Sequence, residues 1–208
     1  MAQLRIRRLQ LGSYGTNGYV VACATTGKTV LIDAPGQAGD ILTALSGATV
    51  EHILITHGHG DHLEALAGVK AALRVPVAAH AGDSFRLPGE PDRLLKDGDT
   101  VEVGQVVLRV IHTPGHTPGS ICLYTEGHLF SGDTLFPNGP GRTGSPQAFR
   151  QVVDSIVKRL FVLPDDTAVY PGHGEGTVLG REKELFAAFS RRPADPDLCG
   201  DVLWVPGA

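Results

Sequence analysis

Cysteine is scarce in this sequence, and its scarcity excludes two ways of stabilising a small fold. The 208 residues include 3 cysteines, Cys23, Cys122 and Cys199, which are far apart and follow no paired spacing. Neither a disulfide framework nor a cysteine-rich zinc site is therefore expected. A chain of this length can bury enough apolar surface to be stable without such crosslinks. We predict a protein of a reducing compartment, the cytoplasm.

Long apolar runs and clustered positive charge are missing as well. No stretch approaches the roughly 20 apolar residues that a membrane span needs, and residues 1–6 lack the continuous apolar segment of a secretion signal. The formal net charge is −4, and the one dense basic stretch, residues 5–8, is short. Affinity for a phosphate backbone depends on clustered lysine and arginine. The sequence thus predicts neither a membrane nor a nucleic acid as partner.

Glycine, in contrast, is abundant. The chain has 27 glycines and 14 prolines, which indicates many tight turns between short strands and helices. Apolar residues make up 42% and charged residues 19%, as in an ordinary globular protein. We assign residues 1–192 to one domain, and we expect residues 193–208, rich in Pro, Asp and Gly, to form a tail packed on it. The tail's apolar residues would cap the core or contact a partner subunit.

The hydrophobic pattern predicts an alternation of strands and helices. β-Branched and alternating runs predict strands at residues 3–11, 19–24, 29–33, 52–56, 75–79, 100–103, 106–112, 120–125, 128–131 and 168–171. Apolar residues at helical spacing predict helices at residues 37–45, 62–73, 146–160 and 181–189. Each half runs from strands to helices. We therefore expect two sheets packed face to face, with helices covering their outer faces.

The decisive segment is residues 56–62, Thr-His-Gly-His-Gly-Asp-His, directly after an apolar strand. Its four potential metal ligands, His57, His59, Asp61 and His62, cannot lie on one helix face. They need a tight loop, which the two glycines permit, to turn imidazoles and a carboxylate toward one point. So many partly basic groups in one turn repel each other unless a cation compensates them. The segment therefore predicts a metal site.

Three further ligand candidates occur in equivalent settings. His116, Asp133 and His173 each follow a predicted strand, and each has a glycine next to it in the sequence. A single histidine is usually a surface or core residue, but four strand ends that present ligands in chain order are rarely produced by chance. The other four histidines, His52, His80, His112 and His128, have no metal spacing and are assigned structural or surface roles.

These motifs resemble the metallo-β-lactamase fold superfamily, whose signature is a His-x-His-x-Asp-His loop followed by single His, Asp and His ligands. The resemblance covers nearly the whole chain. It implies an α/β fold, the αββα four-layer sandwich, with the site along one edge of the sheets. It also implies that one metal ion is held by His57, His59 and His116, a second by Asp61, His62 and His173, and both by a bridging Asp133.

The ligand chemistry fits two divalent metal ions. Imidazole and carboxylate without thiolate suit zinc, and also iron or manganese. Two metals that share a water lower its pKa toward neutrality and supply hydroxide. Asp61 and Asp133 are the catalytic candidates, since their carboxylates would position that hydroxide. The ions, carboxylates and hydroxide leave roughly one net positive charge, which favours a small anionic substrate or a developing oxyanion.

Within the superfamily, residues 113–120 and 131–136 resemble the glyoxalase II-like branch, as do residues 141–143 and 176–182. Those enzymes hydrolyse thioesters of hydroxy acids, typically S-lactoylglutathione. The resemblance implies attack of a metal-bridging hydroxide on a thioester carbonyl. Where these enzymes carry Lys-Phe-Tyr, this chain has Arg142-Thr143-Gly144, and it ends before their helical C-terminal domain. Arg142 is a candidate for binding a substrate carboxylate, while the thiol carrier stays open.

Two other functions remain. A persulfide dioxygenase has the same fold and ligands, the second-site residues included, but binds one ferrous ion, through positions matching His57, His116 and Asp133. A non-catalytic metal-binding protein would have lost ligands, whereas all seven positions are filled here. A β-lactamase proper is disfavoured, because the secreted enzymes usually have arginine in place of His62 and cysteine in place of Asp133. We expect a monomer or a small homo-oligomer.

Asp33, at the end of the strand 29–33, is a candidate for supporting the site from behind the ligands. Its carboxylate could orient a ligand histidine through the ring nitrogen that does not face the metal. An ordinary helix or turn cap is the alternative role for Asp33. Thr56, Thr113 and Ser131 precede ligand turns, and we interpret them as ordinary residues at strand ends.

Overall fold

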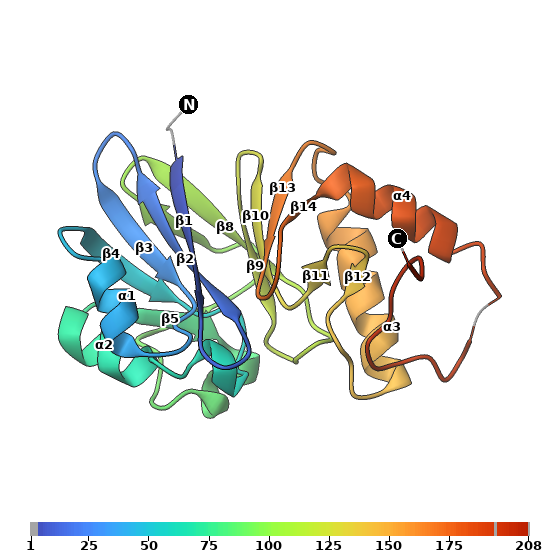
Figure 1. Ribbon diagram of the computed structural model, residues 1–208, viewed down its shortest axis with the longest axis horizontal. Helices are drawn as coiled ribbons and strands as arrows, with labels where there is room; N and C mark the ends of the chain where they lie inside the picture. Colours follow the sequence, from blue (N-terminus) through green and yellow to red (C-terminus); the bar gives the residue numbers. More distant parts are fainter. Residues whose placement is uncertain (1–3, 194, 208) are drawn as a thin grey trace.

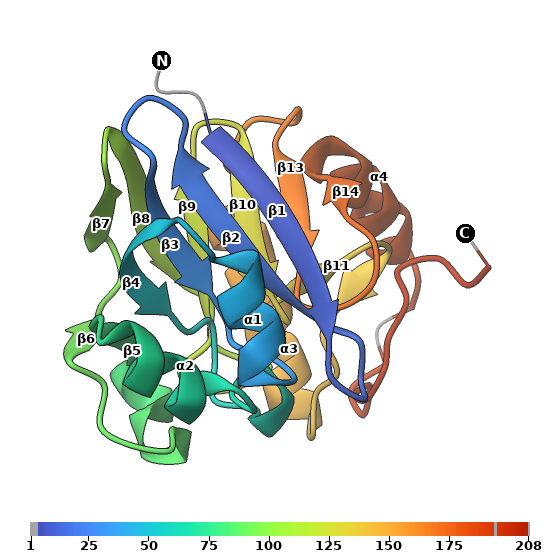
Figure 2. The ribbon, with the colours of Figure 1, turned by 60° about the vertical axis from the view of Figure 1, so that its left-hand side comes forward.

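The computed structural model describes residues 4–193 and 195–207. Two six-stranded sheets pack face to face, and helices cover the outer face of each, so the molecule has four layers (Figure 1). The predicted α/β sandwich is confirmed. Figure 2 shows the strands of the first sheet in front of those of the second. Within the described residues, no helix is both long and apolar enough to span a bilayer.

The first sheet is formed by the N-terminal half of the chain. In spatial order its strands are β1 (Leu4–Leu11), β2 (Thr16–Cys23), β3 (Lys28–Ile32), β4 (Thr49–Leu54), β5 (Val77–His80) and β6 (Arg93–Leu95). Strands β1 to β3 are antiparallel, and β3 to β6 are parallel. Parallel neighbours need crossover connections, and these include α1 (Ala38–Ala44) and α2 (Leu66–Leu73).

The second sheet is formed by the C-terminal half. Its strands in spatial order are β14 (Thr177–Val178), β13 (Ala168–Pro171), β10 (His128–Gly132), β9 (Ile121–Thr125), β8 (Val106–His112) and β7 (Thr100–Val103). Its outer face is covered by α3 (Pro146–Ser155), which continues as the π-helical turn η3 (Ile156–Leu160), and by α4 (Leu179–Phe189). A hairpin of β11 (Leu135–Phe136) and β12 (Gly139–Pro140) lies beside this sheet.

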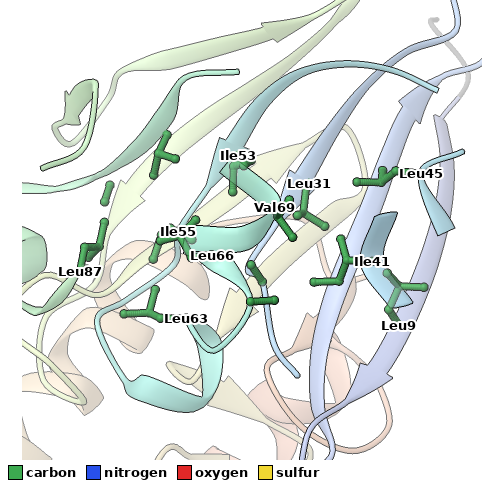
Figure 3. Packing of buried hydrophobic residues seen from close by; sticks show 14 of the residues in the cluster. Leu9, Leu31, Ile41, Leu45, Ile53, Ile55, Leu63, Leu66, Val69 and Leu87 are labelled. Carbon is green, nitrogen blue, oxygen red and sulfur yellow. The ribbon is translucent and has the colours of Figure 1, made fainter. Parts of the chain in front are cut away.

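Alternating side chains along β3 show how one strand supports two layers of core. Val30 and Ile32 belong to the core between the sheets, whereas Leu31 belongs to the core beneath α1 and α2. Figure 3 shows Leu31 beside Ile41 of α1 and Val69 of α2. Because successive side chains of a strand point to opposite faces, a strand covered on both sides is a continuous apolar run in the sequence.

The structure differs from the sequence prediction mainly in short elements. The helix expected at 62–73 begins only at Leu66, as α2, because the residues before it form a 3-10 turn of the ligand loop, η1 (Gly60–His62), and a further turn at 63–65. The turn η2 (Ala81–Arg86) and the strands β6, β11, β12 and β14 were not predicted. They have six residues or fewer each, too few for a periodic pattern.

The tail is partly embedded in the outer core of the second sheet. Trp204 is fully buried, and its ring lies 5.1 Å from that of Phe186 and 5.0 Å from that of Phe189, both on α4. Val202 is buried as well, whereas Leu203 between them is 52% exposed. Apolar residues of the tail therefore cap this core.

Candidate metal centre

The ligand loop follows β4 and is fixed by a buried carboxylate from outside the motif. Asp83 in η2 accepts a hydrogen bond from the backbone N–H of Gly58 at 2.8 Å. It also accepts one from Gly119 at 3.0 Å and one from the Thr117 hydroxyl at 2.6 Å. Asp83 thereby joins the loop 57–62 to the loop that carries His116. Sequence reasoning missed this residue, because a single aspartate in a short turn carries no distinguishing signal.

The remaining ligands reach the same place because strand ends of both sheets meet at one edge. Asp133 follows β10 and His173 follows β13, and these strands are parallel neighbours. Backbone hydrogen bonds join the two sheets here, from Asn17 to Gly172 at 2.7 Å and from Ile121 to Thr56 at 2.9 Å. At Gly172 a Cβ would collide with the Asp133 carboxylate, so only glycine allows this approach.

The seven candidate ligands form two groups. The first group consists of His57, His59, His116 and Asp133, and the second of Asp61, His62 and His173; within each, one potential ligand atom per residue lies within 4.8 Å of the others. In the first group, His59 Nδ1 lies 3.1 Å from His57 Nε2 and 2.9 Å from His116 Nε2. In the second, His173 Nε2 lies 3.2 Å from Asp61 Oδ2. The grouping follows the division that the family resemblance implied.

Asp133 faces both groups. Its Oδ2 lies 3.5 Å from His116 Nε2 in the first group and 3.5 Å from His173 Nε2 in the second. Its Oδ1 lies 3.3 Å from His62 Nε2. One carboxylate is thus positioned to contribute an oxygen to each of two neighbouring ions.

Two buried atoms test whether the cluster fits metal ions. His62 Nε2 and Asp133 Oδ1 are inaccessible to solvent and, although they lie 3.3 Å apart, neither makes a well-oriented hydrogen bond to any of the described residues. A buried polar atom without a partner costs about 1–3 kcal/mol, and a divalent cation would satisfy both atoms. The donor set of imidazole nitrogens and carboxylate oxygens is one that zinc, iron and manganese accept. The residues therefore fit a pair of divalent cations.

Asp33 supports the second group from behind. Its Oδ2 lies 2.8 Å from His62 Nδ1, which leaves Nε2 facing the other ligands. The same carboxylate accepts hydrogen bonds from the backbone and hydroxyl of Thr56 at 2.8 and 2.7 Å. Its partners lie on other segments, so Asp33 orients a histidine and does not cap its own turn. Thr56 takes part in this network, beyond the ordinary role expected for it.

Other ligands are oriented by groups that the sequence did not reveal. The Nδ1 of His116 lies 2.8 Å from the carbonyl oxygen of Arg142, to which it can donate. The hydroxyl of Thr16 donates to Asp61 Oδ2 at 2.8 Å. These contacts span 26 and 45 positions in the sequence. No local motif signals them.

The pKa values of the histidines differ between the groups. Burial, together with the charge of His62, lowers the pKa of His57 well below 6.5, and burial lowers that of His59. Burial acts in the same direction on His62, but the carboxylates of Asp33 and Asp133 outweigh it and raise its pKa to about 10. Contacts with Asp133 and Asp61 raise the pKa of His173 to about 9.

The carboxylates of the centre shift the other way. Burial favours protonation of Asp61 and Asp133, but contacts with His173 and the nearby charge of His62 outweigh it. The pKa of each carboxyl is therefore held well below its ordinary value. Both remain ionised at neutral pH and are available as ligands.

Arg142 lies at the mouth of the centre and not among the ligands. Its side chain is 76% exposed, and its Nε lies 3.8 Å from Asp201 of the tail. Among the described residues, none of His52, His80, His112 and His128 belongs to either ligand group. His80 and His112 stack on each other with ring centroids 4.0 Å apart.

Comparison with known proteins identifies the family. The model of the "Metallo-beta-lactamase superfamily" matches residues 11–173. A hydroxyacylglutathione hydrolase of Rhodospirillum rubrum is 43% identical over 159 residues, 74% of this chain and 60% of that protein. A hydroxyacylglutathione hydrolase of a Polaromonas species is 38% identical over 203 residues, 92% of this chain and 77% of that protein. The chain thus matches less than two thirds of the length of the Rhodospirillum relative.

Solved structures share the fold. The BLEG-1 B3 metallo-beta-lactamase superposes with a TM-score of 0.80 at 30% identity, covering 86% of this chain and 97% of that one. ETHE1 from Myxococcus xanthus gives 0.75 at 31% identity, covering 86% and 81%. The protein TTHA1623, solved in a di-iron-bound form, gives 0.74 at 34% identity, covering 85% and 96%.

Proposed function

Because the chain belongs to the metallo-beta-lactamase superfamily, we propose that it is a dinuclear-metal thioesterase of the glyoxalase II-like type, acting on S-2-hydroxyacyl thiol conjugates. The position of Asp133 between two complete ligand groups carries this proposal. Two relatives named hydroxyacylglutathione hydrolase, 43% and 38% identical to this chain, support the substrate class.

The chemistry divides between the ions and the protein. When bound, two divalent cations supply a nucleophilic hydroxide at neutral pH and polarise the substrate carbonyl. The protein keeps Asp61 and Asp133 ionised, so that their carboxylates orient the attacking water by accepting its hydrogen bonds. Asp33 and the carbonyl of Arg142 fix the rings of His62 and His116. Such fixed ligands need no rearrangement during the reaction.

Zinc is the metal we propose, since three-nitrogen and mixed nitrogen–oxygen sites without thiolate are typical of catalytic zinc. Iron is the alternative, because the neighbouring TTHA1623 structure is described as di-iron-bound. Manganese also accepts these donors.

A mononuclear iron dioxygenase acting on persulfides is the second candidate. His57, His116 and Asp133 present two imidazoles and one carboxylate within the first group. That set is the one found in many non-haem iron oxygenases. The residues of the second group are present in both kinds of enzyme, so the ligand set does not separate the two functions and the metal content does.

One preparation distinguishes these functions. Protein purified without added metal is analysed for zinc, iron and manganese, and then assayed for S-lactoylglutathione hydrolysis, β-lactam hydrolysis and persulfide-dependent oxygen uptake. We expect two metal ions per chain and thioester hydrolysis. One iron per chain with oxygen uptake would establish the dioxygenase instead, and absence of all turnover would indicate a non-catalytic metal-binding protein.

A pair of histidine variants supplies the control. His59→Ala removes a ligand of the first group and should abolish thioester hydrolysis. His52→Ala alters a histidine of β4 outside both groups and should leave the hydrolysis rate unchanged. Equal rates in the two variants would contradict the proposed site.

A further inference from the structure

A cavity of about 330 Å³ opens directly from the metal centre. His116, Asp133 and His173 line one end of it. Its other walls come from the β11–β12 hairpin with the residues that follow it, and from residues 201–203 of the tail. A volume of this size is in the range of small-molecule sites. A substrate held at the ligands would therefore extend its remaining part into this cavity.

The tail segment that forms one wall, residues 198–205, is called the C-terminal arm below. Backbone hydrogen bonds pair Gly200 with Thr143 in both directions, at 2.9 and 3.1 Å. Asn138 binds the arm through its backbone carbonyl, which accepts from Trp204 N–H at 2.9 Å, and through its side chain, which pairs with the backbone of Val205. The arm is thus attached to the segment whose Arg142 carbonyl orients His116.

The walls away from the ligands are largely apolar. Phe136 and Pro140 of the hairpin, with Val202 and Leu203 of the arm, line the cavity. Leu203 is 52% exposed, although its neighbour Trp204 is fully buried. An apolar group bound against this exposed apolar surface removes both from water, which favours binding. The cavity therefore favours an apolar group over a polar one.

The charged residues at the mouth do not favour an anion. Arg142 and Asp201 both line the cavity, and their charges of opposite sign lie 3.8 Å apart. Both side chains are mostly exposed, so the pair itself contributes little stability. The pair matters for binding, because the negative charge of Asp201 offsets the positive charge of Arg142 and so weakens the attraction of Arg142 for a substrate carboxylate.

We propose that the C-terminal arm and the β11–β12 hairpin form a binding subsite for an uncharged apolar group attached next to the scissile carbonyl. This inference rests on the proposed thioesterase function and names the part of the substrate that the enzyme selects. The subsite would discriminate against substrates that bear a carboxylate at this position. Leu203 and Asp201 are its specificity-determining residues.

A binding experiment tests the subsite without turnover. Metal-loaded protein is titrated calorimetrically with 2-phenylethanethiol, which is apolar, and with 3-mercaptopropionate, which carries a carboxylate; both present the same thiol to the metals. We expect the apolar thiol to bind more tightly. Tighter binding of 3-mercaptopropionate would overturn the proposal.

Matched variants locate the effect. Leu203→Asn should weaken 2-phenylethanethiol binding about tenfold, since small losses of apolar contact in a pocket have effects of this size, and should leave 3-mercaptopropionate unaffected. Leu94→Asn is the control, because Leu94 is 50% exposed on β6 and lies outside the cavity. Equal effects of the two variants would overturn the assignment. Fluorescence of Trp204, the single tryptophan, verifies that the arm stays docked.

A second variant does not depend on the arm's apolar packing. Asp201→Asn removes the charge that offsets Arg142 and should improve 3-mercaptopropionate binding about twofold to fivefold, the size expected for an exposed ion pair. Binding of 2-phenylethanethiol should not change. No gain for the carboxylated thiol would contradict the role of Asp201.

Thioester hydrolysis identifies which side of the substrate enters the subsite. The acetyl thioester of 2-phenylethanethiol places the phenyl group on the thiol side, and the phenylacetyl thioester of N-acetylcysteamine, whose blocked amine cannot attack the thioester, places it on the acyl side. Preferential loss of kcat/KM for one of them in Leu203→Asn identifies that side. If neither is hydrolysed while the selective binding persists, the proposed function fails and the subsite stands.

Discussion

The two ligand groups of the centre share Asp133 but differ in how the protein supports them. In the first group, burial lowers the pKa of His57 and His59, so these imidazoles are neutral at pH 7 and ready to bind a cation. In the second, nearby carboxylates raise the pKa of His62 and His173 above neutrality. A cation must therefore displace protons from the second group and not from the first. The two metal ions should differ in affinity and in pH dependence.

The reason for the difference lies behind the ligands. His62 is backed by the buried carboxylate of Asp33, whereas His57 and His116 face the neutral hydroxyl of Thr56 and the neutral carbonyl of Arg142. A carboxylate behind a histidine increases the basicity of its ring and strengthens its bond to a metal, but it also strengthens its bond to a proton. The second group therefore binds its metal ion more weakly at low pH, where protons compete for its histidines.

Removing Asp133, the residue shared by the two ligand groups, should have the largest effect on activity and on metal content. Asp133→Ala deletes the carboxylate that faces both groups, so the metal ions should no longer be held in place to stabilise the transition state. Metal ions contribute several kcal/mol of such stabilisation, and its loss corresponds to a fall of about a thousandfold in kcat/KM. Metal analysis should show fewer than two ions per chain. Retention of both ions and of activity would show that the groups are independent.

A change of pH should separate the groups. Metal affinity of the second group should rise about tenfold per pH unit for each displaced proton between pH 6.5 and about 9, whereas that of the first should be nearly constant. Chelator competition across this range measures both steps. Identical slopes would contradict the comparison.

Whereas the metal affinity of the second group should rise with pH, the stability of the metal-free protein should fall as the pH rises. Because the folded pKa values of His62 and His173 lie above 6.5, their stabilising contribution is complete below pH 6.5 and is lost as the pH rises toward 9 and 10. Thermal unfolding of metal-free protein should therefore occur at lower temperature at pH 9 than at pH 6.5. A rise in the unfolding temperature over that interval would show that these imidazoles are not held as cations.

Loss of the supporting carboxylate should weaken the second group selectively. Asp33→Asn keeps the left-handed backbone at this position, φ 57°, which asparagine tolerates, while removing the charge. Affinity for the second ion should fall about tenfold to a hundredfold, with a smaller effect on the first ion, which Asp33 reaches only through Thr56. Asp40→Asn, on the exposed side of α1, is the matched control. Equal weakening of both ions would indicate a general structural effect.

The smallest effect is expected from the hydroxyl that holds Asp61. Thr16→Val removes one hydrogen bond within the second group, with an expected threefold to tenfold loss of affinity for the second ion, about the value of one such bond. Thr29→Val provides the control, since Thr29 is equally buried and its hydroxyl binds the carbonyl of Gly27. If the two variants behave alike, Thr16 does not position Asp61.

Much of the fold could be predicted from the sequence because long elements carry periodic patterns. The apolar residues Val30–Ile32 of β3, and Ile53 and Leu54 at the end of β4, indicated strands, and the order of strands followed by helices in each half indicated the sandwich. Short elements such as β6 and the β11–β12 hairpin could not be predicted. They exist because neighbouring strands and the C-terminal arm complete their hydrogen bonds.

The ligands themselves were determined by local sequence. A loop of histidines and an aspartate separated by glycines has a chemistry that the sequence alone makes recognisable, and the single ligands at His116, Asp133 and His173 follow strand ends. The groups that hold these ligands in position could be identified only from the tertiary structure. Asp83, Thr16 and the carbonyl of Arg142 act on ligands far away in the chain, and a hydrogen bond between distant segments leaves no periodic trace in either one.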